Sequence, residues 1–201
     1  MLRCAITSGD GWAAIAQAQR RAVEGVEFVQ LREKQLEAGE LVRLAAAMRA
    51  SLRETGKTKL LVNGRADVAV AAGADGVHLT SRAGELTAEQ VRQVFRAAGV
   101  GEPLVSASCH SLEEVHRAVD GDVDLILFGP VFEKRVANEA VVTGVGLEAL
   151  REACGLAGKT PVLALGGVTW ESAELCVEAG AAGVAGIRLF SGGIETARNS
   201  R

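Results

Sequence analysis

The chain has 201 residues, of which 48% are hydrophobic, and a formal net charge of −3. This length suits one domain over residues 1–201, at the lower end of the size of an eight-fold α/β barrel. The acidic balance and the scattered lysines and arginines argue against a nucleic-acid partner. No secretory signal pattern opens the chain, and no apolar run approaches the roughly 20 residues of a membrane span. We therefore expect a soluble, cytoplasmic protein.

The four cysteines are widely spaced, at Cys4, Cys109, Cys154 and Cys176, and form no CxxC pair. A secreted disulfide framework would place them more densely. We interpret them as reduced thiols.

Short β-rich runs alternate along the chain with longer runs of helical period. The predicted strands cover residues 2–7, 28–32, 59–63, 76–79, 104–108, 125–129, 161–165 and 183–187. Among the helices, 40–54 has one apolar face, formed by Leu41, Leu44, Ala45, Met48 and Leu52, and 88–98 has another, formed by Val91, Val94 and Phe95. Eight βα units with apolar strands predict a single closed parallel (β/α)8 barrel of the TIM type.

The end of the chain is too short for a full eighth helix. After Phe190 only residues 191–201 remain. We expect a truncated last helix, with either an incomplete outer ring or a homodimer contact over the gap.

In barrels of this type the chemistry lies where strands end, at the carboxyl-terminal face. The residues there are Ser8, 32–34, 63–65, 80–82, 108–110, 129–134, 166–169 and 186–188. The glycines Gly166, Gly167 and Gly186 would let backbone N–H groups approach a phosphate, and Arg188 would add a countercharge. The alternative is that these glycines only permit tight turns and that Arg188 is a solvated side chain.

The segment "QLREK" places Gln30 and Arg32 on one face of the second strand, with Lys34 just beyond it. Two cations at a barrel mouth suit an anionic ligand. A buried structural network of Gln30 and Arg32 is the alternative, and Glu33 should point away from Arg32.

His110 stands at the end of the fifth strand, just before Ser111 and Glu114, whose spacing resembles a capping box. Histidine suits acid–base chemistry near neutral pH, whereas a cap-supporting surface histidine is the plainer interpretation. We expect His78 to be a hydrogen-bonded core residue and His116 to be exposed.

Two other kinds of site find little support at the strand ends. Cys109 should be a packed, inert thiol, because strand alternation turns it away from His110. Carboxylates, which Mg²⁺ needs, are nearly absent, since Asp67 and Asp75 lie within or after the third helix.

Several segments together resemble the family of thiamin phosphate synthase and the TenI-type thiazole tautomerase along nearly the whole chain. They are "QLREK", "VNGRADVAVAAGADGVHL", "SASCHSLEEV", "GPVF" and "ALGGVTWESAELCVEAGAAGVAGI". The resemblance implies a (β/α)8 barrel, a role in thiamin biosynthesis and a thiazole phosphate ligand.

By position, the resemblance also implies ligand-binding residues. Those matching the pyrimidine diphosphate site of the synthase are Gln30, Arg32, Lys34, Asn63 and Ser108. Those matching the thiazole phosphate site are Gly166, Gly167, Ile187 and Arg188. His110 matches a histidine implicated in TenI-type proteins.

This chain departs from the synthase pattern where that pattern holds Mg²⁺. Gly64 and Ala83 stand in place of the two metal-associated carboxylates. After "GPVF" the synthase has a Thr-x-Thr-Lys run, for which Lys134 and Arg135 would substitute only loosely. TenI-type proteins resemble this chain in lacking those carboxylates and in having an arginine where Arg82 stands.

Three hypotheses follow from these features. The first is a metal-independent thiazole tautomerase, with His110 as the acid–base group and no cofactor. The second is a divergent thiamin phosphate synthase, the only case in which Mg²⁺ is expected. The third is a non-catalytic binder of thiazole phosphate or thiamin phosphate. We favour the isomerase over the transferase at this stage.

Overall fold

The structure is a computed structural model of the 201-residue chain, and it describes residues 1–136 and 139–191. The chain divides into two compact units. We call residues 4–106 the first unit and the remainder of the chain the second unit. The barrel strands within each unit are parallel, and most of them are followed by a helix. The strand order over both units, β1-β10-β9-β6-β5-β4-β3-β2, is that of a closed barrel. The predicted (β/α)8 class is therefore confirmed.

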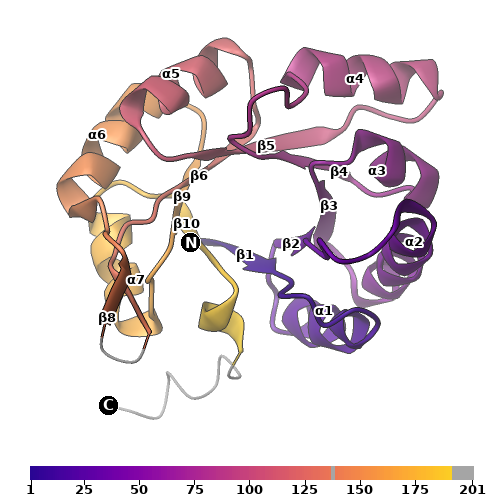
Figure 1. Cartoon of the computed structure of the whole chain (residues 1–201), viewed down its shortest axis with the longest axis horizontal. Helices are drawn as coiled ribbons and strands as arrows, with labels where there is room; N and C mark the ends of the chain where they lie inside the picture. Colours follow the sequence, from indigo (N-terminus) through magenta and orange to yellow (C-terminus); the bar gives the residue numbers. More distant parts are fainter. Residues whose placement is uncertain (137–138, 192–201) are drawn as a thin grey trace. The chain divides into compact units, whose positions relative to one another are not determined.

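The first unit begins inside β1 (Leu2–Ile6), at residue 4, and ends inside β5 (Leu104–Cys109), at residue 106. Its elements in between are α1 (Ala13–Val23), β2 (Phe28–Leu31), α2 (Ala38–Thr55), β3 (Lys59–Asn63), α3 (Ala66–Ala72), β4 (Gly76–Leu79) and α4 (Ala88–Ala97). The register pairs Ile6 with Gln30, Gln30 with Leu61 and Asn63 with His78. In Figure 1 the helices α1, α2 and α3 line the outer side of these strands.

The second unit contains the later elements. They are α5 (Leu112–Asp120), β6 (Leu125–Phe128), β7 (Lys134–Val136), β8 (Glu139–Val142), α6 (Gly146–Ala157), β9 (Val162–Leu165), α7 (Trp170–Glu178), β10 (Gly183–Gly186) and the 3₁₀ helix η1 (Arg188–Phe190). Strand β9 pairs in parallel with both β6 and β10. The β7–β8 pair is antiparallel and stands apart from the barrel strands.

Apolar periodicity explains the helices. All five residues predicted for the inner face of α2 are buried. In α4, Val91 and Phe95 are buried as predicted, but Val94 is 37% exposed. The prediction for Val94 was wrong. Val94 lies three positions after Val91 and one before Phe95, which places it on the margin of the apolar stripe, where a side chain is partly exposed.

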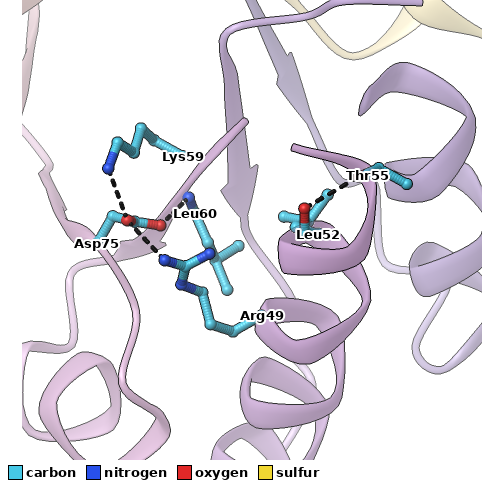
Figure 2. A network of polar contacts seen from close by, with 6 residues as sticks. All are labelled: Arg49, Leu52, Thr55, Lys59, Leu60 and Asp75. Atoms are coloured by element: carbon cyan, nitrogen blue, oxygen red, sulfur yellow. Dashed lines mark hydrogen bonds and ion pairs between the residues drawn. The ribbon is translucent and has the colours of Figure 1, made fainter. Parts of the chain in front are cut away.

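An ion cluster around the buried carboxylate of Asp75 fixes the start of β3 against the start of β4, as Figure 2 shows. The carboxylate of Asp75 accepts hydrogen bonds from Arg49 Nη2 at 3.0 Å, Lys59 Nζ at 3.1 Å and the Leu60 N–H at 2.9 Å. Its side chain is only 8% exposed. The cluster lies at the amino ends of the strands, where stability rather than catalysis is expected.

Among the described residues, no helix has the length and apolar character of a membrane span. The predicted truncated eighth helix would fall on residues 191–201, of which 192–201 lie outside the described part. The described chain ends in η1 and Ser191.

Candidate active site

An amide pair, buried Gln30 and half-buried Asn63, lies near the ends of β2 and β3. Gln30 Nε2 donates to Asn63 Oδ1 at 3.0 Å, and Gln30 is only 2% exposed. Over the residues that the structure describes, Gln30 Oε1 has no hydrogen-bond partner. A buried acceptor without a donor costs free energy, so an N–H group of a ligand at this position would be stabilised.

Three cations follow strand ends of the same unit: Arg32 and Lys34 after β2, and Arg82 after β4. Arg32 is half-buried, and its backbone N–H donates to Thr7 Oγ1 at 2.9 Å. The Arg32 guanidinium lowers the pKa of the Lys34 ammonium, with a loss of hydration and the charge of Arg82 acting in the same direction. Within the described chain, none of the three pairs with an acidic side chain. Positive charges that affect one another and have no acidic partner repel, so the binding of an anion among them is favourable.

His78 lies beside Asn63 in the register but is a core residue, as predicted. It is buried, and its Nδ1 lies 2.9 Å from Ser106 Oγ. Burial, reinforced by the charge of Arg32, lowers the pKa of His78 to about 3. The ring is therefore neutral at physiological pH and does not add to the cationic cluster.

The metal-associated positions of the synthase pattern carry a different arrangement. Gly64 has φ +64°, and a Cβ there would lie 3.5 Å from Glu85 Oε2. The Glu85 carboxylate is already engaged, accepting hydrogen bonds from Thr80 Oγ1 at 2.6 Å and from the Thr80 N–H at 3.2 Å. Among the described residues, no three acidic, histidine or cysteine side chains group as metal ligands. The expected absence of a Mg²⁺ site stays a prediction, because Mg²⁺ is commonly held by one or two carboxylates together with substrate phosphates rather than by three protein ligands.

His110 lies at the start of the second unit, after the last residue of β5. Its Nδ1 contacts the carbonyl oxygen of Gly129. A carbonyl only accepts, so Nδ1 carries the hydrogen of this contact, and in the corresponding tautomer Nε2 is the acceptor. The ring is exposed, so Nε2 is free to exchange a proton with a ligand.

The expected capping box at His110 differs in detail. Ser111 Oγ accepts from the Glu114 N–H at 3.2 Å, as predicted for an N-cap. Glu114 Oε2, however, accepts from the N–H of His110 at 2.5 Å, one residue earlier than a capping box requires. The cap therefore fixes the backbone of His110 directly.

Cys109 and Ser108 precede this histidine. Cys109 is packed as predicted, only 1% exposed, and burial is the main cause that raises the pKa of its thiol to about 12. Its inertness stays a prediction. Ser108 is half-buried within β5. Its assignment to the pyrimidine diphosphate site stays a prediction.

The glycines of "GGVT" are needed by the fold itself. Gly166 and Gly167 have φ +87° and +67°, and an added Cβ would lie 2.7 Å from Pro130 Cα and 2.6 Å from the Phe132 carbonyl oxygen. The Phe132 N–H donates to the Gly166 carbonyl at 3.0 Å. The turn interpretation therefore holds, and phosphate binding remains a prediction. Replacing Gly167 would disturb folding before it tested a ligand.

The first turn of α7 is partly occupied by its own side chains. Thr169 and Ser172 form a capping box, and the Thr169 hydroxyl, together with the local backbone N–H, lowers the pKa of Glu171. A phosphate at this helix start would meet the negative charge of Glu171. The helix terminus alone is therefore a weaker anion site than the glycine pattern indicates.

The residues predicted at the end of β10 differ in exposure. Gly186 is buried, whereas Ile187 and Arg188 are exposed at the start of η1. Phe190, at the end of η1, packs edge-to-face on Trp170, with ring centroids 5.5 Å apart. This aromatic pair joins the segment after β10 to the start of α7.

The comparisons with known proteins point to one family. The family model for thiamine monophosphate synthase matches residues 4–190. A protein of Aquifex aeolicus whose name places it among the thiamine-phosphate synthases is 39% identical over 83% of this chain and 84% of its own length. The thiamine-phosphate synthase of Thermus thermophilus is 33% identical over 92% of this chain and 86% of its own.

A solved structure agrees with these relatives. Thiamine phosphate pyrophosphorylase from Pyrococcus furiosus is 26% identical, covers 98% of this chain and 91% of its own, and superimposes with a TM-score of 0.81. The names of these relatives are those of synthases. They therefore support the transferase alternative rather than the isomerase that the sequence led us to favour.

Proposed function

Because the chain belongs to the thiamine monophosphate synthase family, we propose that it is a transferase of thiamin biosynthesis that joins a pyrimidine diphosphate to a thiazole phosphate and releases diphosphate. The observation that carries this proposal is the hydrogen bond between buried Gln30 and half-buried Asn63, together with the cations after β2 and β4 that have no acidic partner among the described residues. The amide pair suits the N–H and ring nitrogen of a pyrimidine, and the cations suit its diphosphate.

In the proposed reaction the C–O bond to the diphosphate breaks, and its electron pair leaves with the diphosphate oxygen. The thiazole nitrogen supplies the electron pair of the new C–N bond. Arg32 and Lys34 stabilise the negative charge that develops on the leaving group, a task that preorganised cations perform well. No step is assigned to a metal ion, since Gly64 and Ala83 provide no carboxylate.

We assign the thiazole phosphate to the second unit, as the resemblance implies. Its contacts would come from the backbone of Gly166, Gly167 and Gly186 and from Ile187 and Arg188. The exposed guanidinium of Arg188 supplies the positive charge there. Replacing Arg188 by Ala tests this assignment without the steric disturbance that a change at Gly167 would bring.

The test of the transferase is the formation of thiamin phosphate from the two substrates by the purified chain. Arg32→Ala should remove most of this activity. Arg53→Ala is the matched control, because Arg53 is an exposed arginine in the last turn of α2 and also lacks a described acidic partner. Equal loss in both variants would show that only total charge matters and would count against the site.

A second candidate, the thiazole tautomerase, is favoured by the contact between His110 Nδ1 and the Gly129 carbonyl. It leaves Nε2 to take a proton from the thiazole and return it elsewhere on the ring, a shift that needs no metal. Aromatisation of thiazole carboxylate phosphate, followed by its ultraviolet absorbance, tests this candidate. If neither reaction proceeds while thiazole phosphate still binds, the non-catalytic binder is the remaining function.

A further inference from the structure

The carboxylate of Glu33 lies between the two cations of "QLREK" in the sequence, yet it serves a different part of the chain. Glu33 is only 3% exposed. Its Oε1 accepts from the Gly9 N–H at 3.1 Å, and its Oε2 accepts from the Gly11 N–H at 2.8 Å. Gln35 Nε2 donates to the same Oε2 at 2.9 Å. A buried carboxylate with three N–H donors is a strong, directional anchor.

These bonds tie two segments that follow neighbouring strands. Gly9 and Gly11 belong to the loop after β1 and have φ +100° and +55°, a conformation that side chains rarely adopt. Gln35 Nε2 adds a second tie by donating to the Gly9 carbonyl at 3.1 Å. The Arg32 N–H donates to Thr7 Oγ1 at 2.9 Å, which holds the start of the same loop. The β1–α1 loop and residues 32–35 therefore form one hydrogen-bonded assembly.

We propose that Glu33 is a positioning residue for the anion site. Its carboxylate fixes the β1–α1 loop against residues 32–35 and thereby holds Arg32 and Lys34 where an anionic substrate is bound. This inference rests on the proposed function, in which those two cations bind diphosphate. Glu33 touches no substrate itself, since its oxygens are occupied by the Gly9, Gly11 and Gln35 donors.

The sign of the effect separates positioning from simple electrostatics. A negative charge next to two cations opposes the binding of an anion, so Coulomb's law alone predicts tighter binding when Glu33 is neutralised. Positioning predicts the opposite. In Glu33→Gln the amide NH₂ would face backbone N–H groups, the loop would lose an anchor, and the cations would lose their fixed geometry.

The experiment measures the dissociation constant of inorganic diphosphate by calorimetry, with EDTA present. We expect Glu33→Gln to weaken binding by about tenfold, the equivalent of one lost charge-assisted hydrogen bond. Glu33→Asp, which keeps the charge but shortens the reach, should behave like Glu33→Gln. Glu54→Gln, an exposed glutamate of α2, is the control for the change in net charge and should bind like the parent.

Tighter or unchanged binding in a folded Glu33→Gln would overturn the proposal. Hydrogen exchange at the Gly9 and Gly11 amides supplies an independent reading, since both should exchange faster in this variant. If Glu33→Gln does not fold, Gln35→Ala removes only the outer tie and should still weaken diphosphate binding; unchanged affinity there would also overturn the proposal.

The same experiment distinguishes this inference from the proposed function. If Arg32→Ala leaves diphosphate binding unchanged, the anion site itself is absent and the proposed function fails. If Arg32→Ala weakens binding but Glu33→Gln does not, the anion site stands and only the positioning role of Glu33 is wrong.

Discussion

His78 Nδ1 lies 2.9 Å from Ser106 Oγ, and both side chains are buried. Burial first, and then the charge of Arg32, lowers the pKa of His78 to about 3. In the unfolded chain an ordinary histidine titrates near pH 6.5. Between these two values the unfolded state binds the proton and the folded state does not.

Stability should therefore fall on acidification because of His78. Above about pH 6.5 its contribution is constant, and from there towards pH 3 the free energy of unfolding should decrease by at most about 1.4 kcal/mol per pH unit. Urea unfolding at pH 7, 6 and 5 measures this slope. His78→Gln, which cannot take up a proton, should give a flatter profile over the same range, and an equally steep profile would show that other groups cause the loss.

Neutralising Asp75 should destabilise the chain strongly. Asp75→Asn leaves Arg49 without its buried countercharge, at a cost of roughly 3 kcal/mol, the low end for a buried pair because Lys59 is half exposed. Asp67→Asn breaks the exposed pair with Arg65 and should cost no more than about 1 kcal/mol. Urea unfolding compares the two. Equal losses would mean that the Asp75 cluster is no stronger than a surface pair.

Gly76 should tolerate no side chain. A Cβ there would lie 1.8 Å from the Leu104 carbonyl oxygen, which belongs to the backbone and cannot move aside cheaply. We expect Gly76→Ala to cost more than about 4 kcal/mol or to prevent folding. Gly155→Ala is the control, because nothing lies within 4 Å of its Cβ and the residue is helical. It should stabilise by roughly 0.5–1 kcal/mol. A folded Gly76→Ala of parental stability would contradict the close approach of these backbones.

The barrel strands could be predicted from sequence because they are short apolar runs bounded by turn residues. The predicted run 28–32 became β2, Phe28–Leu31, and 183–187 became β10, Gly183–Gly186. Each ends one residue early, because Arg32 and Ile187 already turn out of the sheet. The antiparallel β7–β8 pair was not predicted, since its residues, Lys134–Val136 and Glu139–Val142, show no alternation that separates them from a loop.

The candidate site could be predicted only as residue types at strand ends. Alternation correctly separates Glu33 from Arg32, but it says nothing of Gly9 and Gly11, which lie more than twenty residues earlier and meet Glu33 only in the fold. From the sequence alone, Gly166 and Gly167 had two interpretations, a phosphate-binding segment or a tight turn. The approach of Pro130 and Phe132, which requires the glycines, is a tertiary contact without a local signal.

His110 should matter for one reaction and not for the other. His110→Asn removes the Nε2 acceptor, so aromatisation of thiazole carboxylate phosphate, if the chain catalyses it, should fall by about 10² to 10⁴. Formation of thiamin phosphate should be much less affected. His116→Asn, on the exposed face of α5, is the control. If His110→Asn isomerises the thiazole as fast as the parent, His110 is not the acid–base group.

The most direct test of the central claim is whether the purified chain forms thiamin phosphate from the pyrimidine diphosphate and the thiazole phosphate, with Mg²⁺ and with excess EDTA. In the proposed function Arg32 and Lys34 supply the positive charge that a metal ion would otherwise bring to the diphosphate. We therefore predict product in both conditions and its loss in Arg32→Ala but not in Arg53→Ala. A parent chain that forms no thiamin phosphate in either condition would contradict the proposed transferase.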